Sequence, residues 1–323
     1  MDFTLSIINN PQSTIPLFYP WILFNLLALG LLLLDLRIIH RGGRVVRSRE
    51  ALGWSLFYVA LAGVVAVVIY FWQGHRVALD FVTGYVVEVS LSADNLFIFL
   101  VIFKFFAAPE ELQHRVLFWG IVGAMLMRAI FIFTGVGLIH HFHWIPYVLG
   151  TLLIYSGVRV CVLGEHKINP ARNPLVKLLR RWIPVTENYR GGKFFVRVPA
   201  EMGRLYATPL LLVLLVIETS DLLFSVDSIP AVLAITLNAF IVYSSNVMAI
   251  LGLRSMYFAV SGLIKIFRFL HYGLAVVLVL VGLKMLIANW HPVSTEVTLA
   301  VVGAVLSTAV VASILFPAKN NGI

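Results

Sequence analysis

The segment Glu88-Val-Ser-Leu-Ser-Ala-Asp94-Asn95 lies inside one long apolar run of the chain, and the segment Asp221-Leu-Leu-Phe-Ser-Val-Asp227-Ser228 lies inside another. Each segment begins with an acid, reaches an aspartate after five further residues and ends on a small polar side chain. A fifth acid, Glu218, stands one helical turn before the second segment. An acidic side chain at the centre of a membrane-spanning helix costs about 2.5–3.5 kcal/mol on insertion scales. The five carboxylates are therefore candidates for a function.

The rest of the chain has the composition of a protein that crosses a membrane several times. Of its 323 residues, 60% are hydrophobic and 12% are charged, whereas soluble domains carry roughly 25% charged residues. The mean hydropathy is +0.96. A helix needs about 20 apolar residues to cross a bilayer, and runs of that kind cover residues 17–38, 51–73, 79–105, 116–139, 144–163, 207–236, 242–264, 270–289 and 296–316. The sequence predicts an all-α polytopic membrane protein with about nine transmembrane helices.

Positive charges between these runs alternate from one side to the other. The first, third, fifth and seventh loops are basic, and residues 164–206 alone hold nine Lys or Arg against three Glu. The loops between them hold Arg76 alone. The positive-inside rule then places the N-terminus outside and the C-terminus in the cytoplasm. We expect a bacterial cytoplasmic membrane, since no organelle-targeting segment is evident, and the net charge of +9 does not indicate nucleic acid.

An internal repeat flanks the basic segment. An acid, an aspartate, an arginine and a glycine recur in the same order on both sides of it. The matched pairs are Glu88 with Asp221, Asp94 with Asp227, Arg128 with Arg254, and Gly157 with Gly282. Spans three to five are therefore expected to repeat as spans six to eight. Because three helices is an odd number, the two halves would insert with opposite topology, and transporters hold their binding sites at the interface of such inverted repeats.

This repeat divides the chain into five parts. They are N-terminal helices in 1–78, repeat one in 79–163, a basic cytoplasmic loop in 164–206, repeat two in 207–289, and a C-terminal helix and tail in 290–323. The loop contains the amphipathic stretch Leu175-Val-Lys-Leu-Leu-Arg-Arg-Trp182. That stretch could lie on the membrane surface or belong to a solvated linker.

Helical periodicity puts only part of each cluster on one face. Three residues of each cluster share a face at i, i+4 and i+7. They are Glu88, Ser92 and Asn95 in the first cluster, and Asp221, Ser225 and Ser228 in the second. Asp94 and Asp227 fall off these faces, so they can join the others only where the helix is broken or another helix meets them. Pro230 lacks a backbone N–H and weakens the helical hydrogen bonding near Ser225, which favours a break in the second cluster.

The donor atoms select a class of ion. Carboxylate, amide and hydroxyl oxygens suit hard cations such as Mn²⁺, Ca²⁺ and Mg²⁺. Neither cluster holds a histidine or a thiol, and the one cysteine, Cys161, lies in another run, where it is expected to pack. Five acids against two arginines leave a charge of −3, which a divalent cation reduces to −1, so an acid is expected to take up a proton in some state. Metal and protons then compete for the same oxygens.

Other polar residues of the spans allow two interpretations each. Arg128 and Arg254 are expected to pair with the acids, either to lock helices together or to gate the site. Ser92, Ser225 and Asn246 could extend a polar path, although Asn246 also suits a helix start. The outer-loop residues His140, His141 and His143 could hold a departing metal or form an exposed turn.

Several motifs resemble those of the TerC/Alx family of integral membrane proteins. The matching stretches are 84–95, Tyr206-Ala-Thr-Pro209, Glu218-Thr-Ser-Asp221, 224–231 and 246–254. The resemblance covers nearly the full chain, and the length and nine-span layout are similar to the Alx branch. It implies cation handling, chiefly Mn²⁺ export, with links to alkaline pH and tellurite resistance. It also implies metal or proton roles for Glu88, Asp94, Asn95, Glu218, Asp221, Asp227 and Ser228.

These observations predict a secondary transporter that exports a divalent cation, chiefly Mn²⁺ with Ca²⁺ as a second candidate, by proton antiport. We expect no prosthetic group and no enzymatic activity, with membrane lipid, the metal and protons as partners. The phosphate-binding pattern Gly-x-x-x-x-Gly-Lys-[Ser/Thr] does not occur, so ATP-driven transport by this chain alone is not expected. The alternatives are a membrane scaffold or assembly factor, and an intramembrane aspartyl hydrolase that uses Asp94 and Asp227.

Overall fold

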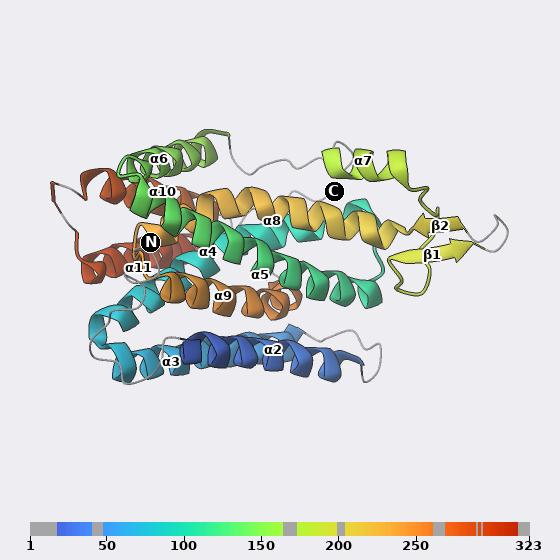
Figure 1. Ribbon diagram of the computed structural model, residues 1–323, viewed down its shortest axis with the longest axis horizontal. Coiled ribbons are helices and arrows are strands. Elements are labelled where there is room, and N and C mark those ends of the chain that lie inside the picture. The colour runs from blue at the N-terminus through green and yellow to red at the C-terminus, as the bar shows by residue number, and fades with distance from the viewer. Residues whose placement is uncertain are drawn as a thin grey trace.

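The computed structural model describes residues 18–40, 48–163, 173–198, 204–260, 269–288, 290–291 and 293–315. Long helices run side by side, and a small β-hairpin lies at one end of the bundle (Figure 1). The helices of the first half are α2 (Phe18–His40), α3 (Ser48–Gln73), α4 (His75–Phe105), α5 (Glu110–His141) and α6 (Ile145–Leu163). Then follow α7 (Pro174–Trp182), β1 (Phe195–Val198) and β2 (Arg204–Ala207). The second half holds α8 (Pro209–Leu233), α9 (Ala239–Val260), α10 (Leu270–Ile287) and α11 (Thr295–Leu315).

Each predicted apolar run coincides with one of these helices, which confirms the all-α polytopic fold. Among the described residues, the helices from α3 to α6 and from α8 to α11 are long and apolar enough to cross a membrane. In α2 the described apolar part, Tyr19–Leu34, is shorter. Helices are the expected form because the hydrocarbon core offers no water to the backbone, and a helix satisfies its N–H and C=O groups internally.

Helix α9 lies at the centre of the bundle. Every residue from Ile241 to Arg254 is buried, as expected for a helix covered on all sides. It packs against α3 and α4 on one side and against α5 on another, while α8 packs against both α4 and α5. Helices α2 and α3 flank the bundle next to α9 (Figure 1). The four helices that carry the repeated acids and arginines, α4, α5, α8 and α9, therefore form the interior of the protein.

The pair α6 and α10 is held together by glycines. A Cβ added at Gly282 would lie 2.7 Å from the carbonyl oxygen of Gly150, and one added at Gly157 would lie 2.6 Å from the carbonyl oxygen of Ala275. Small residues of this kind let two membrane helices approach at backbone distance, where dispersion contacts are dense. The close approach keeps α6 in place beside the site helices.

We expect Gly282→Ala to lower the thermal midpoint of the detergent-solubilised protein. The added methyl group meets the backbone of Gly150 and Ile154 as well as the Ile154 side chain, and overpacking of this kind costs about 1–3 kcal/mol. The matched control is Gly303→Ala on α11, where a Cβ would meet nothing within 4 Å. Equal midpoints for the two variants would show that the close approach of α6 and α10 does not stabilise the protein.

The basic segment between the halves is more than a solvated linker. Strands β1 and β2 pair antiparallel, with Phe195 opposite Ala207 and Val198 opposite Arg204. The hydroxyl of Tyr189 donates to the carbonyl oxygen of Phe106 at 2.8 Å, just beyond α4. Burial raises the pKa of Tyr189 to about 12, so the phenol keeps its proton at physiological pH. The segment is thus anchored to the end of the bundle.

Helix α7 packs alongside the first half of α8 and runs nearly parallel to it (Figure 1). The contact with α8 adds a packing partner that the sequence did not predict for this stretch. Asn173 caps α7 through its Oδ1 atom, which accepts from the backbone N–H of Leu175 at 2.9 Å. Its Nδ2 group donates to Thr219 Oγ1 of α8 at 2.6 Å. Other basic residues used to assign orientation, among them Arg41, Arg44, Lys265 and Lys319, lie outside the described residues.

Candidate functional site

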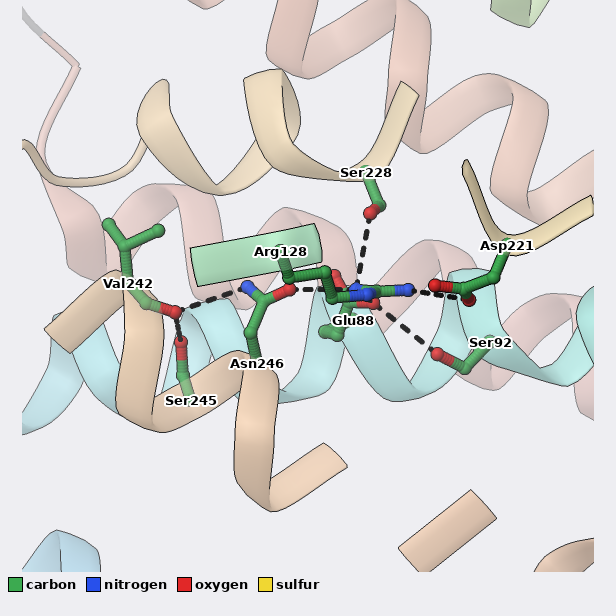
Figure 2. Close-up of polar contacts among 8 residues, drawn as sticks. All are labelled: Glu88, Ser92, Arg128, Asp221, Ser228, Val242, Ser245 and Asn246. Atoms are coloured by element: carbon green, nitrogen blue, oxygen red, sulfur yellow. Dashed lines mark hydrogen bonds and ion pairs between the residues drawn. The ribbon is translucent and has the colours of Figure 1, made fainter. Parts of the chain in front are cut away.

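Arg128 of α5 is the central residue of the site. Its side chain is 0% exposed, and its guanidinium contacts groups from three other helices (Figure 2). It forms an ion pair with Glu88 of α4, and Nη2 donates to Asp221 Oδ1 of α8 at 3.3 Å. Nη1 also donates to Asn246 Oδ1 of α9 at 2.7 Å and to Ser228 Oγ of α8 at 3.4 Å. One planar cation therefore joins α4, α5, α8 and α9.

Local hydrogen bonds orient the groups that meet Arg128. The Nδ2 group of Asn246 donates to the Val242 carbonyl oxygen at 3.2 Å, which turns Oδ1 toward the guanidinium. Ser92 Oγ donates to Glu88 Oε1 at 3.4 Å, one turn along α4. Asn95, on the same face of that helix, is buried. The shared face expected at i, i+4 and i+7 is thus directed into the bundle.

The carboxylates carry more charge and more acceptor capacity than Arg128 uses. Glu88 and Asp221 are repeat mates in the sequence, and both are buried. Among the described residues, Glu88 Oε2, Asp221 Oδ2 and Ser225 Oγ are buried without a hydrogen-bond partner. Buried polar atoms are normally paired, so each exception calls for an explanation. Two carboxylates facing one guanidinium leave a formal charge of −1 at this point.

Asp227 belongs to a different face of α8. Its Oδ1 accepts a hydrogen bond from Ser156 Oγ of α6 at 2.6 Å. A neighbouring helix therefore meets this aspartate, which was one of the two arrangements that the sequence allowed. The other arrangement is not found, because α8 runs without interruption from Pro209 to Leu233 with Pro230 inside it. Helix α4 is also continuous through the first cluster, and the side chain of Asp94 lies outside the described residues.

Glu218 lies against α5 at a glycine. A Cβ added at Gly123 would overlap the Glu218 carboxylate, so the glycine makes room for the acid. Glu218 is half-buried and stands one turn from Asp221 on the same helix. The three acids of the second cluster, Glu218, Asp221 and Asp227, therefore follow one another along α8 within about three helical turns.

A small cavity of about 20 Å³ adjoins Asp221. Its walls are apolar side chains from α4, α5, α8 and α9, together with the two charged residues Asp221 and Arg254. Arg254 is 4% exposed, so both repeated arginines are in the interior. A cavity of about 10–15 Å³ or more can hold one water molecule when polar groups are present. This cavity therefore has room for a water molecule between Asp221 and Arg254.

The described residues contain no group of three or more His, Cys, Asp or Glu arranged to hold a metal ion. Of the acids whose side chains the structure describes, Glu88 and Asp221 lie on either side of Arg128, and Asp227 contacts α6. Any cation bound beside Glu88 and Asp221 would need amide and hydroxyl oxygens to complete its shell. Asn246, Ser228 and Ser92 supply oxygens of that kind next to the two carboxylates.

Three contacts were missed by sequence reasoning. Ser156 was overlooked, although a serine within the fifth span is a visible signal. Gly123 gave no signal, because its importance depends on the side chain that α8 places opposite. Asp80 near the start of α4 was not counted with the acids, yet it is buried and accepts a hydrogen bond from Thr295 Oγ1 of α11 at 2.7 Å. The outer histidines His140, His141 and His143 are exposed.

Comparison with known proteins gives relatives along nearly the whole chain. The family model described as "Integral membrane protein TerC family" matches residues 73–321. An uncharacterized membrane protein of Myxococcus xanthus is 46% identical over 295 residues, which is 91% of this chain and 92% of that protein. A protein of Escherichia coli strain K12, named Alx as a candidate membrane-bound redox modulator, is 42% identical over 275 residues, with 83% and 85% covered. An uncharacterized membrane protein of Rickettsia bellii is 36% identical over 295 residues, with 91% and 97% covered. No solved structure matches the chain.

Proposed function

This chain belongs to the TerC family of integral membrane proteins, and on that premise we propose that it is a secondary transporter. Its cargo is a divalent cation, chiefly Mn²⁺, which it exports in exchange for protons through the site around Arg128. The observation that carries the proposal is the arginine itself. It is fully buried between carboxylates from two helices, and within the described part of the chain each carboxylate keeps one oxygen without a hydrogen-bond partner.

Charge favours a divalent cation at this site. Glu88 and Asp221 together carry −2 when ionised. Arg128 reduces this charge to −1, whereas a divalent ion in place of the guanidinium would cancel it. An uncompensated charge in a low-dielectric interior is costly, so the guanidinium and the metal are suited to occupy the site in turn. The oxygens of Asn246, Ser228 and Ser92 are hard ligands, which match Mn²⁺, Mg²⁺ and Ca²⁺ rather than soft metals.

Protons provide the exchange partner. Carboxylates that lose a cation in a buried place favour the neutral, protonated form, and a metal can bind only when that proton has left. Glu88, Asp94, Glu218, Asp221 and Asp227 are the groups that we assign to this competition. Arg128 acts as the internal cation while no metal is bound, and Arg254 is proposed to take the equivalent part in the other half.

Contacts between the halves support the inverted repeat, which we include in the proposal. The offset of 125 residues that relates Gly157 to Gly282 also relates Gly150 to Ala275. Shifting each residue by 125 positions into the other half turns the contact of Gly150 with Gly282 into the contact of Ala275 with Gly157. The two close approaches are therefore repeat mates. Likewise α4 packs on α9 as α8 packs on α5. Two halves related in this way can exchange roles, which gives a transporter two facing states.

Flux measurements test the proposal. The full chain is reconstituted in vesicles with an acidic interior, and radiolabelled Mn²⁺ is added outside. We expect proton-driven Mn²⁺ accumulation that collapses when an ionophore removes the pH gradient. The absence of Mn²⁺ movement under any gradient would overturn transport and favour the alternative, a membrane scaffold or assembly factor built on the anchored β1–β2 hairpin.

Orientation is proposed from the charge pattern, with the N-terminus outside and the C-terminus in the cytoplasm of a bacterial cell. In a Cys161→Ser background, we expect Arg76→Cys and His141→Cys to react with an impermeant reagent added to intact cells. Arg190→Cys, in the basic segment, should react only after the cells are opened. All three side chains are exposed in the structure. The reverse pattern would overturn the orientation and the direction of export with it.

A further inference from the structure

A buried histidine lies near one end of the bundle and has no part in the site described so far. His114 of α5 is 9% exposed. Its ring packs on Phe258 of α9, with ring centroids 4.1 Å apart and planes tilted by 31°. Among the described residues its Nδ1 atom is buried without a hydrogen-bond partner. A buried ring nitrogen left unpaired is an exception that calls for a role.

The histidine stands at one end of a continuous row on α5. Residues 114, 117, 121, 124 and 128 follow one another at helical spacing, so they share one face. Leu117, Ile121 and Ala124 of this row line the cavity beside Asp221, and Arg128 ends it at the site. His114 is one turn beyond the cavity wall, toward the end of α5 that the charge pattern assigns to the cytoplasm.

Charged groups near His114 come from its own helix and from α9. From α9, Arg254 acts electrostatically on the imidazole and also lines the cavity. On its own helix, Arg115 lies over the ring of Phe194, 5.9 Å from its centroid, and Glu110 and Glu111 form the first turn. The preceding residue, Gln113, accepts a hydrogen bond from the Tyr257 hydroxyl at 2.9 Å.

Building on the proposed antiport, we propose that His114 passes protons between the cavity and the cytoplasm. The neutral imidazole accepts a proton on one ring nitrogen and becomes an imidazolium beside Arg254. It then releases a proton from the other nitrogen, so the ring returns to its neutral form and one proton has crossed it. Histidine suits this step because its two ring nitrogens can accept and donate a proton in turn. Burial among apolar side chains, together with repulsion by Arg254, disfavours the charged form, so the imidazolium is short-lived.

The test separates proton transfer from packing. His114→Gln keeps a polar side chain of similar size but cannot take up and release a proton. Phe258→Leu removes the stacked ring and leaves the imidazole intact. His140→Gln changes an exposed histidine at the other end of α5. Each variant and the unaltered chain are reconstituted in vesicles, and Mn²⁺ entry and proton exit are recorded together from pH 5 to 8 with a radiolabel and a pH-sensitive dye.

We expect the unaltered chain to exchange Mn²⁺ for protons across this range, and His114→Gln to lose about 100-fold of the proton-driven flux, the low end of what a positioned proton-transfer group contributes. Phe258→Leu and His140→Gln should keep the flux. The relay is overturned if His114→Gln retains the normal flux and proton-to-metal ratio, or if Phe258→Leu reproduces its loss. If the unaltered chain moves no Mn²⁺, the proposed function fails and the relay fails with it.

Discussion

Replacing Arg128 by leucine is expected to remove most of the folded protein from the membrane. The change leaves Glu88 and Asp221 buried without their cation, and removing one partner of a buried ion pair costs about 3–5 kcal/mol. Proteins are stabilised by only about 5–15 kcal/mol in total, so the loss is a large share of the stability. The measurement is the amount of monodisperse protein recovered from membranes, compared with Arg76→Leu, which changes an exposed arginine at the start of α4.

A second variant separates folding from transport. Arg128→Lys keeps the charge but loses the planar fork that reaches two carboxylates at once. We expect the lysine variant to accumulate and to bind Mn²⁺ while its transport falls, because the internal cation no longer spans α4 and α8. If the repeat is inverted, Arg254→Lys should trap the opposite facing state. Normal transport by Arg128→Leu, or by a protein in which both Arg128 and Arg254 are leucine, would rule out the pairing and the gating role.

Neutralising Asp227 should abolish Mn²⁺ transport while the protein stays folded. Asp227→Asn keeps one oxygen and nearly the same shape, but it removes the charge that compensates for dehydration of the metal. Asp94→Asn, its repeat mate, is expected to behave in the same way. Both variants should be recovered from membranes at normal levels, because uncharged groups are cheaper to bury than charged ones, and their Mn²⁺ flux should fall below detection.

Ser156→Ala separates the charge of Asp227 from its orientation. It removes the hydrogen bond to Asp227 Oδ1 but leaves the carboxylate charge in place. Loss of a group that orients a metal ligand typically costs 10–100-fold in affinity or activity, so we expect about a tenfold loss of flux. Normal flux in both Asp94→Asn and Asp227→Asn would exclude these acids from the transport path.

The spans and the polar face of each cluster could be predicted from the order of the amino acids alone. A bilayer of fixed thickness demands a fixed number of apolar residues, so the runs could be counted and each became a helix. Residues spaced at i, i+4 and i+7 must share a face, which is why Glu88, Ser92 and Asn95 point inward together. The pairing of Arg128 with cluster acids also followed, because an unpaired arginine at such depth is too costly.

Which side chains meet depends on how the helices pack, and local spacing does not record it. Spacing fixes the face of a helix but not the neighbour that packs there, so the sequence could not show that Arg128 takes both Glu88 and Asp221, or that Asp227 turns to Ser156 of α6. Nor could it place α7 alongside α8, since an amphipathic pattern fits a membrane surface and a protein surface equally well. The break expected from Pro230 is absent for a related reason. Pro230 lies within the last turn of α8, where the loss of one backbone hydrogen bond interrupts little of the helix. Helix rotation and the choice of partner arise from packing between distant segments, which no local pattern records.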